Sequence, residues 1–354
     1  MTDPPVEKAG QNKPDIVVTG RPVGVPADPS DASEPPMPVP AASGKRRRGD
    51  RIFTGMTLGA STFVIAILVA IGVFLVAKAI PALRDNTGNF FTTKTYETAG
   101  DKPKFGIAAL AFGTVFSSVV ALIIAAPIAV GVALYVTQYA NPRIAKPVGY
   151  LVDLLAAVPS VVYGLWGVLF LAPHMRGLQH FLNQYFSWLP FFHSTAKNPT
   201  TTNSLLLAST VLAIMILPII TAICREVFVQ VPLANKEAAL ALGATKLEMI
   251  RTAVLPYSRA GMVSGIMLGL GRALGETIAV ALTLSAAFGI HWNLLGNGNT
   301  IAANIAVRYG ESDPTGRSAL IATGLVLFVI TLIVNLMARG IVYRSSRLTT
   351  KGSA

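Results

Sequence analysis

Six apolar segments, each long enough to cross a lipid bilayer, constrain this chain more than any other feature of its sequence. A membrane-spanning helix needs about 20 predominantly apolar residues, whereas a barrel strand needs only about 10 residues of alternating polarity. The lengths therefore favour helices, and we predict an all-α polytopic membrane protein. The predicted spans cover residues 54–80, 106–139, 147–171, 203–224, 257–288 and 318–342.

The composition excludes an ordinary water-soluble globule. Of the 354 residues, 52% are apolar and only 13% are charged, against about 25% charged residues in a typical soluble domain. The net charge of +12 does not indicate nucleic-acid binding, because no basic stripe is interleaved with aromatic residues. The single cysteine, Cys224, cannot form an internal disulfide. The four histidines match no metal motif, so we expect no metal or other cofactor in this chain.

The basic residues predict how the chain is organised across the membrane. Residues 1–49 are rich in proline and contain no apolar run, which predicts a disordered tail. That tail ends in a basic run, and further basic residues lie between the fourth and fifth spans and at the C-terminus. Since basic residues favour the cytoplasmic side, we place both termini there. Residues 50–345 form the predicted membrane domain, and residues 346–354 form a short cytoplasmic tail.

The third predicted loop, residues 173–202, contains apolar side chains at helical spacing. They are Leu178, Phe181, Leu182, Tyr185 and Leu189. The pattern predicts a helix on the outer side. This helix either lies on the membrane surface or packs against the outer end of the bundle.

The cytoplasmic loop between the fourth and fifth spans carries local signals for two short helices. Asn235 is a candidate N-cap with Glu237 in the first turn, and Gly243 is a candidate stop. Thr245 and Glu248 then match a capping box. We therefore expect a helix, a glycine turn and a second helix that ends before the fifth span. The small side chains after Glu237 allow another protein backbone to dock closely.

Glycines at intervals of four residues mark the fifth predicted span. Gly261, Gly265 and Gly269 form one series, and Gly271 and Gly275 form another. Small residues at this spacing let helix backbones approach each other closely. We therefore assign these five glycines to helix packing.

The fifth span also contains two charged residues, Arg272 and Glu276. In a continuous helix their spacing places them on one face, one turn apart. A charge deep in a span faces a partner or a water-filled cavity. Either the two residues neutralise each other, or Arg272 binds an anionic substrate through parallel hydrogen bonds while Glu276 holds the arginine. In the third span, Asp153 either lines a path near the break at Pro159 or is solvated at the inner surface.

The loop at residues 225–256 resembles the EAA loop of ABC-importer permeases. The matching residues are Glu237, Ala238, Ala239, Gly243, Leu255 and Pro256. Ala253 departs from the usual isoleucine. The strings GRALGET, residues 271–277, and LLAAVPSVVYGLWG, residues 154–167, resemble the PstC-type permeases of phosphate importers.

This resemblance implies a type I ABC-importer permease in a bacterial inner membrane. Inorganic phosphate would pass Arg272 and Glu276, and residues 225–256 would dock an ATPase. The implied partners are a PstA-type second permease, a PstB-type ATPase dimer and a PstS-type extracytoplasmic binding protein. The chain has no G-x-x-x-x-G-K-[ST] phosphate loop, so we expect the partner to use the ATP and this chain not to be an enzyme.

Two alternative functions stay open at this point. Sulfate or molybdate could replace phosphate, because tetrahedral oxyanions share the same hydrogen-bond donors. An ion-coupled secondary transporter would need no ATPase, although the capped loop argues against it. A membrane enzyme has little support, because the sequence shows no His/Asp/Glu cluster and no Ser/His/Asp grouping at one membrane depth.

Overall fold

The computed structural model describes residues 48–98, 102–192 and 203–351. The predicted disordered tail, residues 1–49, lies outside these residues except at its last two positions. By its internal contacts the chain divides into two units, Met1–Phe63 and Val64–Ala354. The first unit contributes the beginning of the first helix. The second unit contains the other elements.

The described part of the chain is helical except for one short ribbon. Strands β1 (Tyr96–Glu97) and β2 (Lys104–Phe105) pair antiparallel, with Tyr96 opposite Phe105. The longer helices are α1 (Arg48–Asp85), α2 (Ala108–Leu134), α3 (Pro142–Ala156), α5 (Ala172–Tyr185), α6 (Leu205–Val229), α9 (Leu255–Leu274) and α12 (Pro314–Lys351). The shorter ones are α4 (Ser160–Trp166), α7 (Leu233–Ala241), α8 (Lys246–Met249), α10 (Ile278–Thr283) and α11 (Ile301–Arg308). Three π-helical segments, η2 (Tyr135–Tyr139), η3 (Gly167–Leu171) and η4 (Ile250–Val254), join neighbouring helices.

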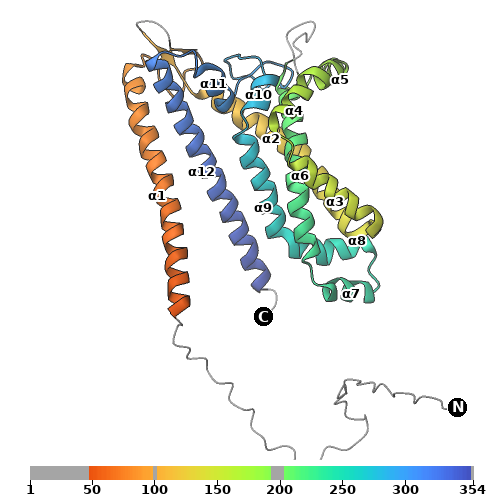
Figure 1. Ribbon diagram of the computed structural model, residues 1–354. Helices are drawn as coiled ribbons and strands as arrows, with labels where there is room; N and C mark the ends of the chain where they lie inside the picture. Colours follow the sequence, from red (N-terminus) through yellow and green to blue (C-terminus); the bar gives the residue numbers. More distant parts are fainter. Residues whose placement is uncertain (1–47, 99–101, 193–202, 352–354) are drawn as a thin grey trace, which may run out of the picture. The chain divides into compact units, whose positions relative to one another are not determined.

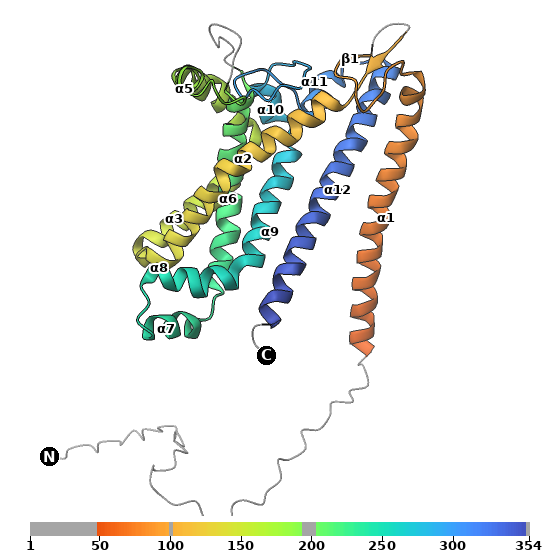
Figure 2. The same ribbon diagram turned by 180° about the vertical axis from the view of Figure 1, so that it is seen from behind.

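Helix α6 forms the centre of the second unit. It packs against α2, α9 and α3, and Figures 1 and 2 show it beside α9 in both views. Four alanines of α2 are completely buried in the same core cluster as α6 and recur every four residues: Ala121, Ala125, Ala129 and Ala133. Such a stripe of small side chains permits close helix contact. The sequence-based predictions did not include this alanine stripe.

Helix α9 contacts α6 through three of the five predicted glycines, Gly261, Gly265 and Gly269. A Cβ atom at these positions would meet Val227, Ile223 and Ile220 of α6, respectively. Gly271 has a different neighbour, because its Cβ would lie 3.9 Å from Asn335 Oδ1 of α12. Gly275 lies beyond the end of α9 and would meet only nearby backbone of its own segment. The structure thus places the first series against α6 and separates the second series from it.

Five helices of the described residues are long and apolar enough to cross a membrane. They are Ile52–Asp85, Ala108–Tyr139, Ser160–Tyr185, Leu205–Val229 and Pro314–Gly340. Four of them match the first, second, fourth and sixth predicted spans. The third predicted span, residues 147–171, has the wrong bounds. Pro159 separates α3 from α4 because proline lacks an N–H and restricts the preceding residue, and the long apolar helix begins only at Ser160.

The fifth predicted span, residues 257–288, is wrong as a continuous helix. Helix α9 ends at Leu274, and α10 begins at Ile278. Side chains of the intervening residues satisfy backbone groups that the break sets free. The Glu276 carboxylate accepts a hydrogen bond from the Ala279 N–H at 3.2 Å, and the Thr277 hydroxyl donates to the Gly275 carbonyl at 3.1 Å. Such local bonds allow a helix to be interrupted within a membrane domain.

The two ends of the second unit carry different elements. Helices α7 and α8 lie at one end, and α5, α10 and α11 lie at the other (Figures 1 and 2). The predicted helix of the third loop is α5, which buries Met175 and Gln179. Phe181 and Tyr185 of the same helix are exposed. The helix therefore packs on the bundle by one face and presents an apolar face outward.

Replacing Gly265 by alanine should destabilise the protein relative to the same change at Gly271. A Cβ at Gly265 would lie 2.9 Å from Ile223 Cγ2, and overpacking of this kind costs about 1–3 kcal/mol. Gly271→Ala is the matched control on the same helix, since its Cβ meets only an ordinary contact. Thermal unfolding of the two purified variants in detergent measures the difference. Equal midpoints would contradict the packing role of Gly265.

Candidate functional site

The first short helix of the loop at residues 225–256 begins earlier than the sequence suggested. Helix α7 starts at Leu233 behind Pro232, and the Asn235 N–H donates to the Pro232 carbonyl at 3.2 Å. The predicted N-cap at Asn235 is therefore wrong. The proline takes the cap position with φ of −54°, which already suits a helix start. Glu237 consequently lies beyond the first turn.

The predicted glycine turn is confirmed. Gly243 has a φ of +84°, a left-handed conformation that glycine adopts without a steric penalty. Its N–H donates to the Leu240 carbonyl at 3.0 Å, and the Ala244 N–H donates to the Ala239 carbonyl at 3.2 Å. These two bonds define a Schellman motif. They end α7 and fix the direction in which the chain leaves it.

The predicted capping box is also confirmed, but the helix that it starts does not stop. The Glu248 N–H donates to Thr245 Oγ1 at 3.3 Å, and the Thr245 N–H donates to Glu248 Oε2 at 2.8 Å. Helix α8 then continues through η4 into α9, so the predicted end of this helix before the fifth span is wrong. Leu255 and Pro256 form the first turn of α9, where a proline is tolerated. One helical run thus joins the loop to Leu274.

Helix α7 presents almost its whole surface outward. It has no buried residue, Glu237 and Ala238 are exposed, and Ala239 packs partly against the core. Its apolar side chains are exposed as well: Leu233 is 67% exposed, and Leu242 of the following turn is 90% exposed. Leu240 and Leu247 are exposed too. Contiguous exposed apolar surface with a polar rim is typical of a protein-docking site.

Arg272 and Glu276 do not form the helical pair that their spacing predicted. Arg272 occupies the last turn of α9 and is exposed, whereas Glu276 lies in the break that follows and is half-buried. In the described part of the chain no hydrogen bond or ion pair joins them. The spacing argument failed because it assumed a continuous helix. Glu276 instead caps α10, and the arginine charge is left for another group.

The two helix interruptions meet beside Arg272. The Tyr163 hydroxyl of α4 donates to the Leu155 carbonyl of α3 at 2.8 Å, across the first interruption. A Cβ at Gly164 would lie 2.9 Å from the Cα of Ala279 in α10, so the backbones of α4 and α10 touch. Discontinuous helices of this kind line substrate sites in transporters. Tyr163 was overlooked, although it lies in the residue string 154–167 that carried part of the resemblance.

The sequence left Asp153 either lining a path or solvated at the inner surface, and the structure shows a partner that neither alternative included. Arg225 Nη2 lies 3.0 Å from both carboxylate oxygens of Asp153. The Asp153 side chain stays 48% exposed and that of Arg225 25% exposed. No sequence signal links two residues so far apart in the chain.

The described residues do not form a recognisable metal site. They contain no group of three or more His, Cys, Asp or Glu side chains that could hold a metal ion. One of the four histidines, His193, lies outside the described residues. Cys224 is buried in α6 as a free thiol.

Comparisons with known proteins identify the family of this chain. Residues 125–347 match the family of "Binding-protein-dependent transport system inner membrane component". The "Phosphate transport system permease protein PstC 2" of Mycobacterium tuberculosis is 48% identical over 299 residues, which cover 83% of this chain and 92% of the relative. The Mycobacterium leprae PstC is 45% identical, with 86% and 97% covered. The Xylella fastidiosa PstC is 38% identical, with 85% and 92% covered.

The chain therefore belongs to the family of inner membrane components of binding-protein-dependent transport systems. It is a transport component with several membrane-spanning helices rather than an enzyme. Within the family, its sequence places it among the PstC-type permeases of ABC importers, the group named for these relatives.

Removing the Thr245 side chain should loosen the start of α8. Thr245→Ala deletes the acceptor of the Glu248 N–H, and loss of an N-cap costs about 1 kcal/mol, equivalent to a roughly fivefold larger equilibrium constant for local opening. Amide hydrogen exchange over residues 246–249 measures it. Thr252→Ala is the control, since that hydroxyl only donates back to the Glu248 carbonyl.

The same cap should weaken in acid. Hydrogen bonds from the Thr245 N–H and hydroxyl hold the pKa of Glu248 below its ordinary value. The cap is therefore fully present above that ordinary value and is lost as the pH falls through the lowered pKa. A Glu248→Gln variant should show no such pH dependence. Protection that persists unchanged in acid would contradict the role of the carboxylate.

Proposed function

We propose that this chain is a permease subunit that carries inorganic phosphate into the cytoplasm of a bacterium. It would work in the inner membrane as part of an ATP-driven importer that alternates between two openings. The substrate crosses chemically unchanged, so the chain itself needs no cofactor, and a partner subunit hydrolyses ATP. The naming of its relatives as phosphate transport permeases supports the choice of substrate.

The observation that carries this proposal is the outward presentation of α7. A nine-residue helix that buries none of its residues gains little from the fold it belongs to. Nevertheless, a proline start, a Schellman turn and a capping box hold it and its surroundings in one conformation. Such preorganisation lowers the entropy cost of binding a partner. We assign this surface to one ATPase of a PstB-type dimer, on the cytoplasmic side, with both chain termini on that side too.

The helical run from α8 to the end of α9 supports a mechanical link between the docking loop and the substrate path. A movement of α8 is transmitted through η4 to α9, because no loop interrupts the run. The last turn of α9 carries Arg272, whose guanidinium can donate parallel hydrogen bonds to phosphate oxygens. Glu276 would act differently from our first expectation. It holds the start of α10 and so keeps the break open beside the arginine.

The remaining subunits follow from the same proposal. A PstA-type second permease would complete the path, and a PstS-type binding protein would deliver phosphate to the end that carries α5, α10 and α11 (Figure 1). Sulfate or molybdate stays an alternative substrate, since the guanidinium offers each the same donors. An ion-coupled secondary transporter stays the alternative class. The exposed surface of α7 favours the ATP-driven system, because an ion-coupled carrier has no use for an ATPase docking site.

Reconstitution tests the proposed function directly. The chain is expressed with its three candidate partners, purified and inserted into vesicles, and the entry of radiolabelled phosphate, sulfate and molybdate is compared with and without ATP. We expect ATP-dependent entry of phosphate only. A stable complex that transports phosphate without any ATPase subunit would overturn the proposal.

Substitutions on α7 should uncouple ATP hydrolysis from transport. Glu237→Ala and Leu242→Glu change the exposed docking surface and leave every core contact intact. We expect uptake to fall at least tenfold and the ATPase to co-purify less well. Asp85→Ala is the matched control, since Asp85 is an exposed acid at the end of α1, outside the loop at residues 225–256. Unchanged uptake in both α7 variants would count against docking at this surface.

Replacing Arg272 by glutamine should abolish phosphate uptake without preventing assembly. The variant loses the charge that binds the anion, whereas the exposed position demands no packing from it. Arg259→Gln serves as the control, because Arg259 is an exposed arginine nearer the start of the same helix. The measurements are uptake into vesicles and recovery of the intact complex. Wild-type uptake in Arg272→Gln would remove Arg272 from the path.

A further inference from the structure

An ion pair between α3 and α6 has no role in the function described so far. Arg225 Nη2 contacts both oxygens of Asp153 at 3.0 Å. The aspartate lies one turn before the end of α3, and the arginine lies one turn before the end of α6. The pair therefore fastens the last turn of one helix to the last turn of another.

The arginine side chain is held in place by the shape of α3 as well as by charge. A Cβ at Gly149 would collide with Arg225 Nη1. The guanidinium thus lies across a position where α3 has no side chain, one turn before the aspartate that it binds. Because the colliding atom is the far end of a flexible side chain, adding a methyl group at Gly149 would displace the guanidinium rather than the backbone.

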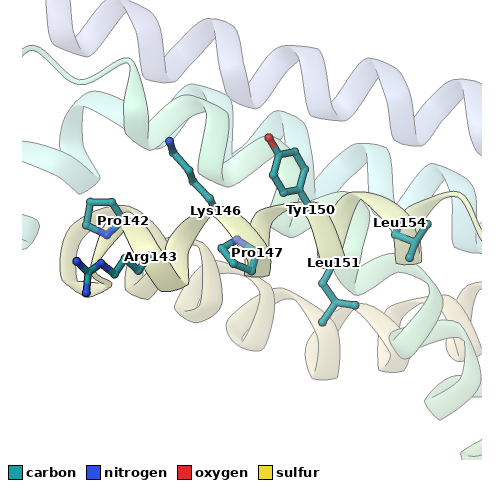
Figure 3. A pocket seen from close by; sticks show the side chains of 7 residues that line it. All are labelled: Pro142, Arg143, Lys146, Pro147, Tyr150, Leu151 and Leu154. Atoms are coloured by element: carbon teal, nitrogen blue, oxygen red, sulfur yellow. The ribbon is translucent and has the colours of Figure 1, made fainter.

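Helix α3 is attached to the rest of the second unit by one narrow face. Of its residues only Gly149 and Val152 are buried, and the helix packs on α6. The exposed side chains of α3 line an open pocket of about 630 Å³, where Figure 3 shows Lys146, Tyr150 and Leu151 projecting from the helix. The bidentate ion pair adds a polar contact to the small buried face by which α3 packs on α6.

Each partner of the pair connects to one of the two regions assigned above. Four residues beyond Arg225, α6 ends at Val229, and the chain continues into α7. On the other side, Leu155 lies two residues beyond Asp153, and its carbonyl accepts the Tyr163 hydroxyl of α4, the helix whose backbone touches α10 just beyond Arg272. The pair is thus the polar contact between the helix that leads to the docking loop and the interrupted helix beside the arginine.

We propose that Asp153 and Arg225 are positioning residues of the transport cycle. Their ion pair makes the end of α3 follow α6, and so carries movement of the docking loop to the interruption at residues 157–159. This inference rests on the proposed function, because it assigns a second route of coupling in addition to α9. It predicts that loss of the pair lowers the phosphate transported per ATP hydrolysed, whereas assembly with the ATPase is retained.

The test uses the complete complex in vesicles and four variants. Asp153→Asn removes one charge, and Gly149→Ala displaces the guanidinium but keeps both charges. The double variant Asp153→Arg with Arg225→Asp exchanges the charges. Gly131→Ala is the matched control, since that helical glycine of α2 has nothing within 4 Å of its Cβ. Phosphate uptake, ATP hydrolysis and subunit recovery are measured for each.

We expect uptake per ATP to fall at least fivefold in Asp153→Asn and to fall in Gly149→Ala, with normal subunit recovery. The charge exchange should bring the ratio back to within twofold of wild type, and Gly131→Ala should leave it unchanged. A ratio within twofold of wild type in Asp153→Asn, or no recovery in the exchanged pair, would overturn the inference.

Two further outcomes are decisive. If Asp153→Asn does not assemble, the ratio in Gly149→Ala decides, and if neither assembles, the pair is a folding element and the inference fails. Failure of the proposed function is recognised separately. In that case the wild-type complex itself would lack ATP-dependent phosphate uptake.

Discussion

Close contact between α6 and two flanking helices is the interaction on which the rest of this structure depends. Within a bilayer, packing of small residues rather than hydrophobic burial drives helix association. Alanines of α2 and glycines of α9 provide it on two sides of α6. Because α6 is thereby fixed, its end can hold the docking loop in a defined place. The same packing sets the position of α9, and hence of Arg272 in its last turn.

The interrupted helices follow from a second constraint, which is that buried backbone groups in a membrane domain need partners. Each interruption satisfies part of this need with a side chain. Tyr163 reaches back to a carbonyl of α3, and Glu276 accepts the N–H of Ala279. These bonds stabilise conformations that a continuous helix would not allow. As a result Arg272 lies next to two interrupted helices. Among the described residues, no ion pair joins its guanidinium to an acidic side chain.

Local features of this fold could be predicted, and distant ones could not. Gly243 and the Thr245–Glu248 box act within a few residues, so their patterns alone were sufficient. Asn235 was misjudged because Pro232, directly before α7, provides an alternative helix start. The break after Leu274 was not predicted, because glycines in a span are compatible both with helix packing and with a helix interruption. The Asp153–Arg225 pair depends on tertiary packing and left no trace in the local sequence.

The position of Arg272 thus depends on two structural features, one along the chain and one across it. Along the chain, a continuous helical run ties it to α8, so its position along the α9 axis follows the docking loop. Across the chain, the segment that follows Arg272 lies against α4, since a Cβ at Gly164 would lie 2.9 Å from Ala279 Cα, and Tyr163 of α4 is bonded to the end of α3. In the coupling proposed above, the end of α3 follows α6. When the two helices move together, the arginine keeps its surroundings; when they move apart, the guanidinium changes its neighbours. A difference in motion between α6 and α9 is therefore sufficient to alter how strongly an anion is held there.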